Sequence, residues 1–303
     1  MEDSKKVTEG YLLVALCGTC WGLMGVLTKK LDLLGFDEFS VAALRPTVAV
    51  AFYLLYTLIK EPKYLKTSVK GLLFFMLYGI VTLDGMFISF TYAVKYSSIA
   101  TASVLLFTNP IFVMIMSRFL FHEKFTKKKI MALVLSIAGC LLVVRAYNVE
   151  AFKLSFWGII FGVISGFTVD LQNVLGKIGA NKYHYKTHLV YSFLFAAVFL
   201  WLFRSPVELI QNATSATAWF YIIAIGFFAT VIPNGSFVKA LQYVESSKAS
   251  IVCSIEPVVA SIMGFLIFRE TLEIWQILGM ALILFSVALI QMKDKTTESV
   301  VNV

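Results

Sequence analysis

The sequence predicts an all-α polytopic membrane protein with ten transmembrane helices, arranged as two inverted repeats of five helices each. Three observations lead to this prediction: the composition, the number of long apolar runs, and a similarity between the two halves of the chain. Of the 303 residues, 59% are hydrophobic and 15% are charged, and the mean hydropathy is +0.83. Soluble domains have roughly 45–50% apolar and about 25% charged residues. The composition therefore excludes a soluble enzyme, a secreted disulfide-rich domain and a disordered chain.

A membrane-spanning helix needs about 20 mainly apolar residues, because each residue rises about 1.5 Å through a hydrocarbon core about 30 Å thick. Ten runs meet this requirement, and most are joined by short polar loops. In chain order they are 10–30, 38–59, 71–93, 98–121, 128–147, 154–177, 187–204, 217–240, 247–268 and 273–292. No small-residue cleavage site follows the first run, so we expect it to be an uncleaved helix.

The basic residues predict the orientation of these helices. With a cytoplasmic N-terminus, 18 Lys and Arg residues fall in inner loops and 7 in outer loops. The positive-inside rule then places both termini in the cytoplasm and the chain in the cell (cytoplasmic) membrane. Because topology accounts for the net charge of +8, we expect no nucleic-acid partner. We expect the lipid bilayer and a small-molecule substrate as partners, and both a monomer and a homodimer fit the sequence.

A shift of 147 residues aligns the two halves of the chain. Pro110 then meets Pro257, and Glu123 meets Glu270. The lysines that follow Glu123 have no counterparts after Glu270, which indicates that the two loops face opposite sides of the membrane. Inverted repeats of this kind are typical of secondary transporters, in which a central site opens alternately to each side.

The repeat also predicts the domain organisation. Because five is an odd number of spans, the second half enters the membrane from the opposite side. We expect a first five-helix repeat at 1–148, an inverted second repeat at 149–292, and a disordered cytoplasmic tail at 293–303.

Short motifs follow the same repeat. The first run contains Trp21-Gly22, the second contains Arg45, and two proline–helix–glutamate units run from Asn109-Pro110 to Glu123 and from Glu256-Pro257 to Glu270. Through these motifs the whole chain resembles the drug/metabolite transporter superfamily, EamA type. The resemblance implies ten helices, a central cavity, and export or exchange of small metabolites such as amino acids, sugars, amines or nucleotide derivatives.

The chain departs from an exact duplication at two of these motifs. Val169-Asp170 stands where the sixth run would repeat the Trp-Gly pair, and the seventh run has no arginine that matches Arg45. We therefore expect the two halves to have unequal roles.

Ionisable residues within membrane helices are candidate functional residues, because each costs roughly 2.5–3.5 kcal/mol to insert at the helix centre. They are Arg45, Asp84, Asp170 and Glu256. Glu256 precedes a proline near the midplane, and its repeat partner is Asn109, so we expect both to line one central site. The candidate substrate-binding residues are Trp21, Asp84, Asn109, Asp170, Asn173, Asn234 and Glu256.

Each candidate also has a structural interpretation. Glu256 could be a buried carboxyl that only supports helix geometry, and Trp21 could be core packing. Asp84 and Arg45 could pair with each other, or Arg45 could gate the outer side. Asp170 and Asn173 share a helix face, from which Gln172 points away, and this pair could line the cavity or could instead form polar contacts to a neighbouring helix.

We expect proton antiport, with Glu256 or Asp170 as the exchanging carboxyl, because acids outnumber bases within the spans. No Walker-type G-x-x-x-x-G-K motif is present, so an ion gradient or the substrate's own gradient is the expected energy source. The expected solute is an amino acid or another amine-bearing or aromatic metabolite, and the expected direction is export.

The sequence predicts neither a metal nor a cofactor. All four cysteines lie inside apolar runs, and His184 and His188, four residues apart, lack further ligands. An intramembrane protease is the enzyme class to weigh against a transporter, but no histidine lies in the middle of a run and neither Asp84 nor Asp170 follows Gly-x-Gly. A channel and a non-transporting membrane receptor are also compatible with a chain of ten spans.

Overall fold

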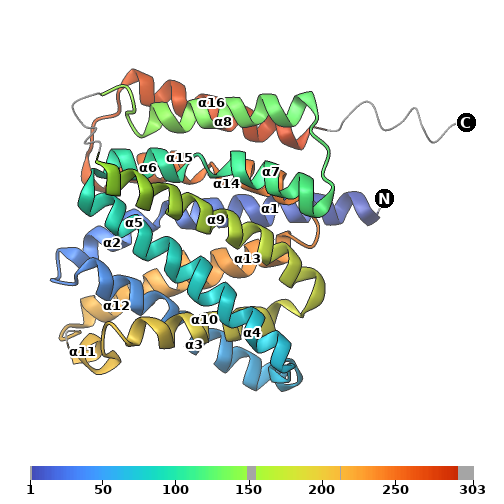
Figure 1. The fold of residues 1–303 in the computed structure, drawn as a ribbon. Helices are drawn as coiled ribbons and strands as arrows, with labels where there is room; N and C mark the ends of the chain where they lie inside the picture. The colour runs from blue at the N-terminus through green and yellow to red at the C-terminus, as the bar shows by residue number, and fades with distance from the viewer. Residues whose placement is uncertain (1, 149–154, 212, 293–303) are drawn as a thin grey trace, which may run out of the picture.

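The computed structural model describes residues 2–148, 155–211 and 213–292, and every regular element in these ranges is helical. Eight segments are long and apolar enough to cross a membrane, and they lie side by side in the bundle (Figure 1). They are Lys5–Asp32, Glu38–Lys60, Val69–Tyr96, Thr101–Phe121, Phe156–Lys182, Ala216–Ala240, Ser246–Phe268 and Ile274–Gln291. The chain is therefore a multi-pass membrane protein. The tail predicted at 293–303 lies outside the described residues.

The two remaining predicted spans form shorter helices. α8 (Lys127–Val143) and α10 (Tyr185–Trp201) have 17 residues each. At about 1.5 Å per residue such a helix is about 26 Å long, slightly less than the hydrocarbon core. α8 ends two residues before Arg145, whose φ is 58°, and packs along α16 (Ile274–Gln291). α10 packs along α3 (Glu38–Lys60). Within the described residues, eight of the ten predicted spans therefore form helices long enough to cross a membrane, and the other two form these shorter helices.

Several spans are interrupted within the bundle. The span Lys5–Asp32 is divided into α1 (Glu2–Gly22) and α2 (Met24–Asp32), and the spans Val69–Tyr96 and Ala216–Ala240 contain π-helical segments at Tyr78–Asp84 and Phe227–Val231. These two segments lie between α4 (Val69–Leu77) and α5 (Gly85–Tyr96), and between α12 (Ala216–Gly226) and α13 (Ile232–Ala240). Such interruptions leave backbone groups in the bundle interior that need other partners.

Two further spans are divided just before a proline. α6 (Ile99–Leu106) is followed by α7 (Asn109–Phe121), and α14 (Ser246–Cys253) by α15 (Glu256–Phe268). The proline is the second residue of both α7 and α15, where its missing N–H would have had no helical partner. Each break therefore places a helix N-terminus in the middle of the bundle.

The helix boundaries repeat at the interval seen in the sequence. α6 and α14 have the same length and begin 147 residues apart, and so do α7 and α15. The residues that follow α7 and α15, His122 and Arg269, both have φ of 56°. The two halves therefore share local backbone structure.

The equivalent loops lie on opposite sides of the bundle. α1 begins and α16 ends on the right-hand side of Figure 1, and this side is here named the terminal side. Near these helix ends Lys239 pairs with Glu9 at 2.7 Å, and Lys128 donates to the carbonyl of Met292. The other side is named the distal side. The loop after α7 lies on the terminal side, next to Lys128, whereas its repeat equivalent after α15 lies on the distal side.

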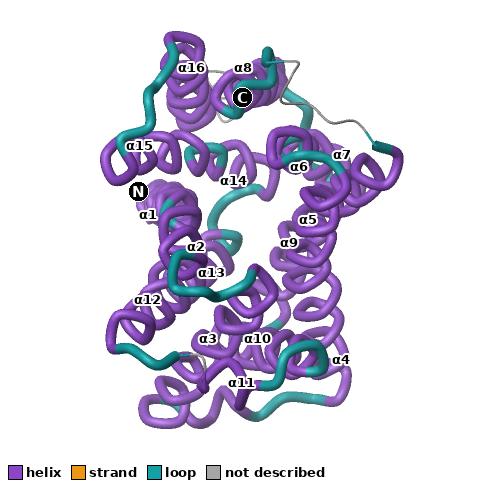
Figure 2. Tube along the Cα trace, turned by 90° about the vertical axis from the view of Figure 1, so that its left-hand side faces the viewer, coloured by secondary structure: helices purple, strands orange, loops and turns teal. Residues whose placement is uncertain are grey.

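α9 (Phe156–Lys182) is the longest described helix, and it packs on α5, α6, α7 and the first π-helical segment. The short α11 (Pro206–Gln211) and the 3-10 turn Pro62–Leu65 belong to loops. Figure 2 views the bundle with the distal loops toward the reader and shows α1, α2 and α12 across from α5, α6 and α9. Helices from both halves of the chain therefore lie on each side of the bundle in this view.

Candidate substrate cavity

A cavity of about 600 Å³ lies between the two halves of the bundle. This volume is within the range of about 300–1,000 Å³ that is typical of small-molecule sites. Its mouth is on the distal side, where Lys29, Asp32, Glu38 and Ile99 line it. Deeper polar lining residues are Arg45, Asp84, Asn109, Gln172, Asn173, Thr230, Asn234, Ser250 and Glu256. Residues from both repeats thus form one polar chamber inside an apolar bundle.

The two repeat-equivalent residues before the prolines both line the cavity. Asn109 is the first residue of α7 and Glu256 is the first residue of α15. The Asn109 Oδ1 atom accepts a hydrogen bond of 3.1 Å from Ser250 Oγ on α14. Glu256 is half-buried and directs a carboxyl group to the cavity at a helix N-terminus, where the helix dipole favours negative charge.

An amide pair on the cavity wall joins two helices of the second half of the chain, α9 and α13. Gln172 Nε2 on α9 donates to Asn234 Oδ1 on α13 at 3.3 Å, and Asn234 Nδ2 donates to the Thr230 carbonyl at 2.9 Å. The expectation that Gln172 points away from the site is therefore wrong. The lining face of α9 consists of Val169, Gln172 and Asn173, which follow the i, i+3, i+4 spacing of one helix face.

Asp170 lies off this face, because successive residues of a helix are about 100° apart. Its side chain is fully buried, and neither carboxyl oxygen has a hydrogen-bond partner within the described ranges. Asp170 is absent from the cavity lining, whereas Asn173, its expected companion, is on it. The structure therefore separates two residues that the helical spacing had predicted to act together.

Two acceptor atoms on the cavity wall have no partner in the described part of the chain. They are Asp84 Oδ2 and Asn173 Oδ1, on side chains that are 2% and 5% exposed. Asn173 Nδ2 donates to the Val169 carbonyl at 2.9 Å, so the Oδ1 atom of the same side chain remains to accept a hydrogen bond from another donor. Buried polar groups are nearly always hydrogen-bonded, so two orphaned acceptors in one chamber fit a ligand that brings donors.

Arg45 also lines the cavity, and its Nε atom donates to Thr230 Oγ1 at 3.2 Å. Within the described residues no ion pair joins Arg45 to Asp84 or to Glu256 at 4.0 Å or less. The described residues therefore do not include an Arg45–Asp84 ion pair. The guanidinium is held by a hydroxyl and faces the chamber.

Aromatic side chains form the apolar part of the chamber. Trp21 packs on Phe237 with ring centroids 5.6 Å apart, and Phe107 and Phe193 line the wall nearby. Trp21 therefore packs against the protein core and also lines the cavity, so it is placed both for core packing and for contact with a substrate.

The histidines and the cysteines contribute little to the cavity. His184 stacks on Tyr64 at 3.5 Å and His188 is fully buried among aromatic rings, so the two do not form a pair. Cys17, Cys20 and Cys140 are buried, whereas Cys253 is half-buried and lines the cavity.

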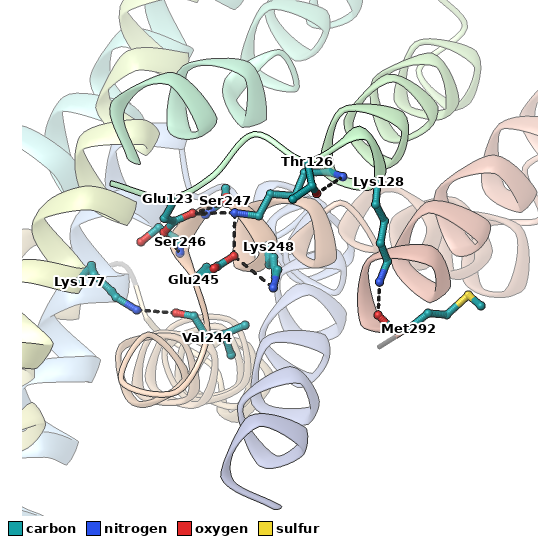
Figure 3. Close-up of polar contacts among 11 residues, drawn as sticks. Glu123, Thr126, Lys128, Lys177, Val244, Glu245, Ser246, Ser247, Lys248 and Met292 are labelled. Atoms are coloured by element: carbon teal, nitrogen blue, oxygen red, sulfur yellow. Dashed lines mark hydrogen bonds and ion pairs between the residues drawn. The ribbon is translucent and has the colours of Figure 1, made fainter. Parts of the chain in front are cut away.

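The cavity does not reach the terminal side. None of the lining residues belongs to the loop after α7 or to the loop before α14. These loops bond to each other instead, through Glu123 and the first residues of α14 (Figure 3). The structure is thus open on one side and closed on the other.

Comparisons with known proteins show which family and which fold this chain resembles. A sequence profile described as the EamA-like transporter family matches residues 8–145 and 156–292. An uncharacterized transporter of Archaeoglobus fulgidus is 31% identical over 200 residues, covering 66% of this chain and 69% of the relative. The uncharacterized transporter YyaM of Bacillus subtilis is 25% identical, covering 83% and 84%. One solved crystal structure matches with a TM-score of 0.80 at 14% identity, covering 94% of this chain and 96% of the other, which shows a shared fold.

Proposed function

The chain belongs to the EamA-like transporter family, and on this premise we propose that it moves a small metabolite across the cytoplasmic membrane by alternating access. In this proposal ten spans form two inverted repeats, 1–148 and 149–292, with α8 and α10 as the two short spans. A chamber with walls from both halves and only one open side supports the proposal, because it is the arrangement that alternating access requires.

The proposed substrate is an amino acid or another amine-bearing or aromatic solute. The single observation that carries this choice is the excess of acceptors in the chamber: Asp84, Asn173 and Glu256 stand against one deep cation, Arg45. An ammonium group brings donors and a positive charge to these acceptors, while Arg45 is suited to a carboxylate. The aromatic wall around Trp21 suits an apolar or aromatic side chain.

The proposed coupling is an exchange of protons for the solute. Glu256 is the favoured exchanging group, because its carboxyl lies on the cavity wall and a cationic solute would compete with a proton there. Asp170 is the second candidate, but it is fully buried behind the lining face of α9. With both termini in the cytoplasm the cavity opens to the outside, which is the state in which an exporter releases its solute and takes up protons.

Transport by purified protein in liposomes tests this function. Amino acids, amines, sugars and nucleosides are first screened by thermal shift, and the stabilising solutes are then followed by counterflow with a pH-sensitive dye inside the vesicles. We expect an amine-bearing solute to exchange with protons, and Glu256→Gln to abolish the proton movement. Glu208→Gln, on a distal loop away from the cavity, is the matched control. Solute flux without counterflow would indicate a channel, and flux without proton movement would remove the coupling.

A further inference from the structure

Glu123 caps the N-terminus of α14 on the terminal side. Its Oε1 accepts from the Ser246 amide at 2.9 Å, and its Oε2 accepts from the Ser247 amide at 3.4 Å and from the Ser247 hydroxyl. Lys129 lies 3.4 Å from Oε2. The Glu123 side chain is only 7% exposed, so a charged group has been buried together with four donors (Figure 3).

A second group of contacts surrounds this cap. Lys129 also pairs with Glu245 at 2.7 Å, Glu245 pairs with Lys248 at 3.2 Å, and Lys177 on α9 donates to the Val244 carbonyl at 2.6 Å. These residues join the loop after α7, in the first half, to α9 and to the loop before α14. Together with Ser246 and Ser247, the residues Glu123, Lys129, Lys177 and Glu245 are here named the terminal clasp. The clasp lies between the closed end of the cavity and the terminal side.

On the distal side, the repeat equivalent of Glu123 is Glu270. Its backbone amide makes the same hydrogen bond, but its side chain has a different partner. The amides of Glu123 and Glu270 donate to the carbonyls of Ser117 and Gly264, both at 3.3 Å. The Glu270 side chain, however, is 57% exposed and pairs with Lys29 at 3.2 Å. Within the described ranges it makes no hydrogen bond to the first turn of α6, the helix equivalent to α14. Ile99, the first residue of α6, instead lines the cavity mouth.

We propose that Glu123 and Glu270 are reciprocal gate residues: Glu123 caps α14 while the cavity is open to the distal side, and Glu270 caps α6 when it is open to the terminal side. The proposal rests on the proposed function. When two inverted repeats exchange their conformations, each local contact is exchanged as well. The closed terminal side therefore shows what the distal side becomes when it closes, with Glu270 leaving Lys29 for the amides of Ile99 and Ala100.

The two caps are unequal in strength. The equivalents of Lys129 and Ser247 are Gln276 and Ala100, so Glu270 loses an ammonium and a hydroxyl that Glu123 has. Charge-assisted hydrogen bonds are the stronger ones, so the cap on α14 is the more stable of the two. The protein without substrate accordingly favours the distal-open state.

Cys253 supplies the reporter for this gate, because it lines the cavity while the other three cysteines are buried. With Cys17, Cys20 and Cys140 replaced by alanine, a membrane-impermeant methanethiosulfonate is applied to vesicles of either orientation without substrate. We expect faster labelling from the distal side in the parent. Glu123→Gln raises the terminal-side rate several-fold and lowers the distal-side rate, whereas Glu270→Gln lowers the residual terminal-side rate.

The opposite signs of these two effects test the gate. Glu9→Gln, which removes another terminal-side ion pair, is the matched control and leaves both rates unchanged. Ser247→Ala is the milder variant of the same cap and moves the rates in the direction of Glu123→Gln. Shifts of equal sign in the two glutamate variants, or no shift, overturn the gate. The labelling experiment needs no substrate. If the two variants shift the labelling rates in opposite directions but the protein moves no solute, the gate stands and only the proposed function is overturned.

Discussion

Gly139 in α8 and Gly279 in α16 face each other so closely that a Cβ atom on either would lie 2.6 Å from the carbonyl oxygen of the other. These two helices pack along their length at the edge of the bundle, as Figure 1 shows. In a bilayer no hydrophobic effect drives helices together, so close backbone approach at small residues is what holds such a pair.

Gly279→Val is therefore expected to destabilise the protein. Overpacking of a close contact costs about 1–3 kcal/mol, because the surrounding backbone has to move. Thermal unfolding of the detergent-solubilised protein measures the effect as a lower midpoint. Gly25→Ala is the control, since a Cβ there meets nothing within 4 Å. An unchanged unfolding midpoint for Gly279→Val would show that α8 and α16 can move apart without a loss of stability.

Asp37 makes stability depend on pH at the distal end of α3. It caps the helix by accepting from the Ser40 amide at 2.8 Å and pairs with Arg204 at 2.9 Å. Partial burial raises the pKa of Asp37, but the Ser40 amide and Arg204 outweigh it and hold the pKa below its usual value. Because the folded pKa is the lower one, this stabilisation is complete above the unfolded value of about 3.9 and is lost as pH falls through the folded pKa.

The comparison of Asp37→Asn with the parent protein tests this dependence. We expect the variant to unfold at a lower temperature at pH 7, and the difference to shrink as the pH falls below about 4. Asp32→Asn, at the last residue of α2, is the control. A difference that does not depend on pH would mean that the charge of Asp37 contributes nothing.

The sequence predicted those parts of the fold that depend on local chemistry. The breaks before Pro110 and Pro257 were predictable, because proline restricts a helix wherever it occurs. Eight of the ten predicted spans form helices long enough to cross a membrane, and the count of ten stays a prediction, because the apolar runs at 128–147 and 187–204 extend beyond the helices that form there. α8 ends at Val143 and α10 at Trp201, each shortly before an arginine.

The cavity lining was harder to predict, because it depends on how each helix is rotated in the bundle. Spacing showed that Asp170 and Asn173 share a face, but the packing of Gly162 and Gly166 against Leu105 decides which face of α9 meets the cavity. That packing brings Gln172 to the cavity and keeps Asp170 off it. The π-helical segments also depend on contacts between residues that are distant in the sequence. The hydroxyl of Tyr53 donates at 2.5 Å to the carbonyl of Val231, which is 178 residues away and ends the second π-helical segment.

The Gln172–Asn234 hydrogen bond is expected to couple α9 and α13 energetically. Removing either side chain leaves a buried amide group without its partner, so the single variants Gln172→Ala and Asn234→Ala lose stability. In the double variant the loss is smaller than the sum, by about 0.5–1.5 kcal/mol for one neutral hydrogen bond. Equilibrium unfolding of the four proteins measures this coupling. Additive losses would indicate that the 3.3 Å contact is not formed in solution.

Asp84 is expected to show opposite effects on stability and on binding. Its Oδ2 atom is buried without a partner in the described part of the chain, so Asp84→Asn replaces a buried ionisable carboxyl by a neutral amide and should leave the unfolding temperature unchanged or raise it. Under the proposed function, the same substitution also removes the carboxylate that would receive the ammonium group of the solute. A hydrogen bond to a charged group contributes about 1.5–3 kcal/mol, so the dissociation constant should rise roughly tenfold to a hundredfold. Thermal shift against solute concentration gives both quantities from one preparation. If Asp84→Asn lowered stability and left the affinity unchanged, Asp84 would be a structural residue, because a residue that serves the ligand at the expense of stability shows the reverse pattern.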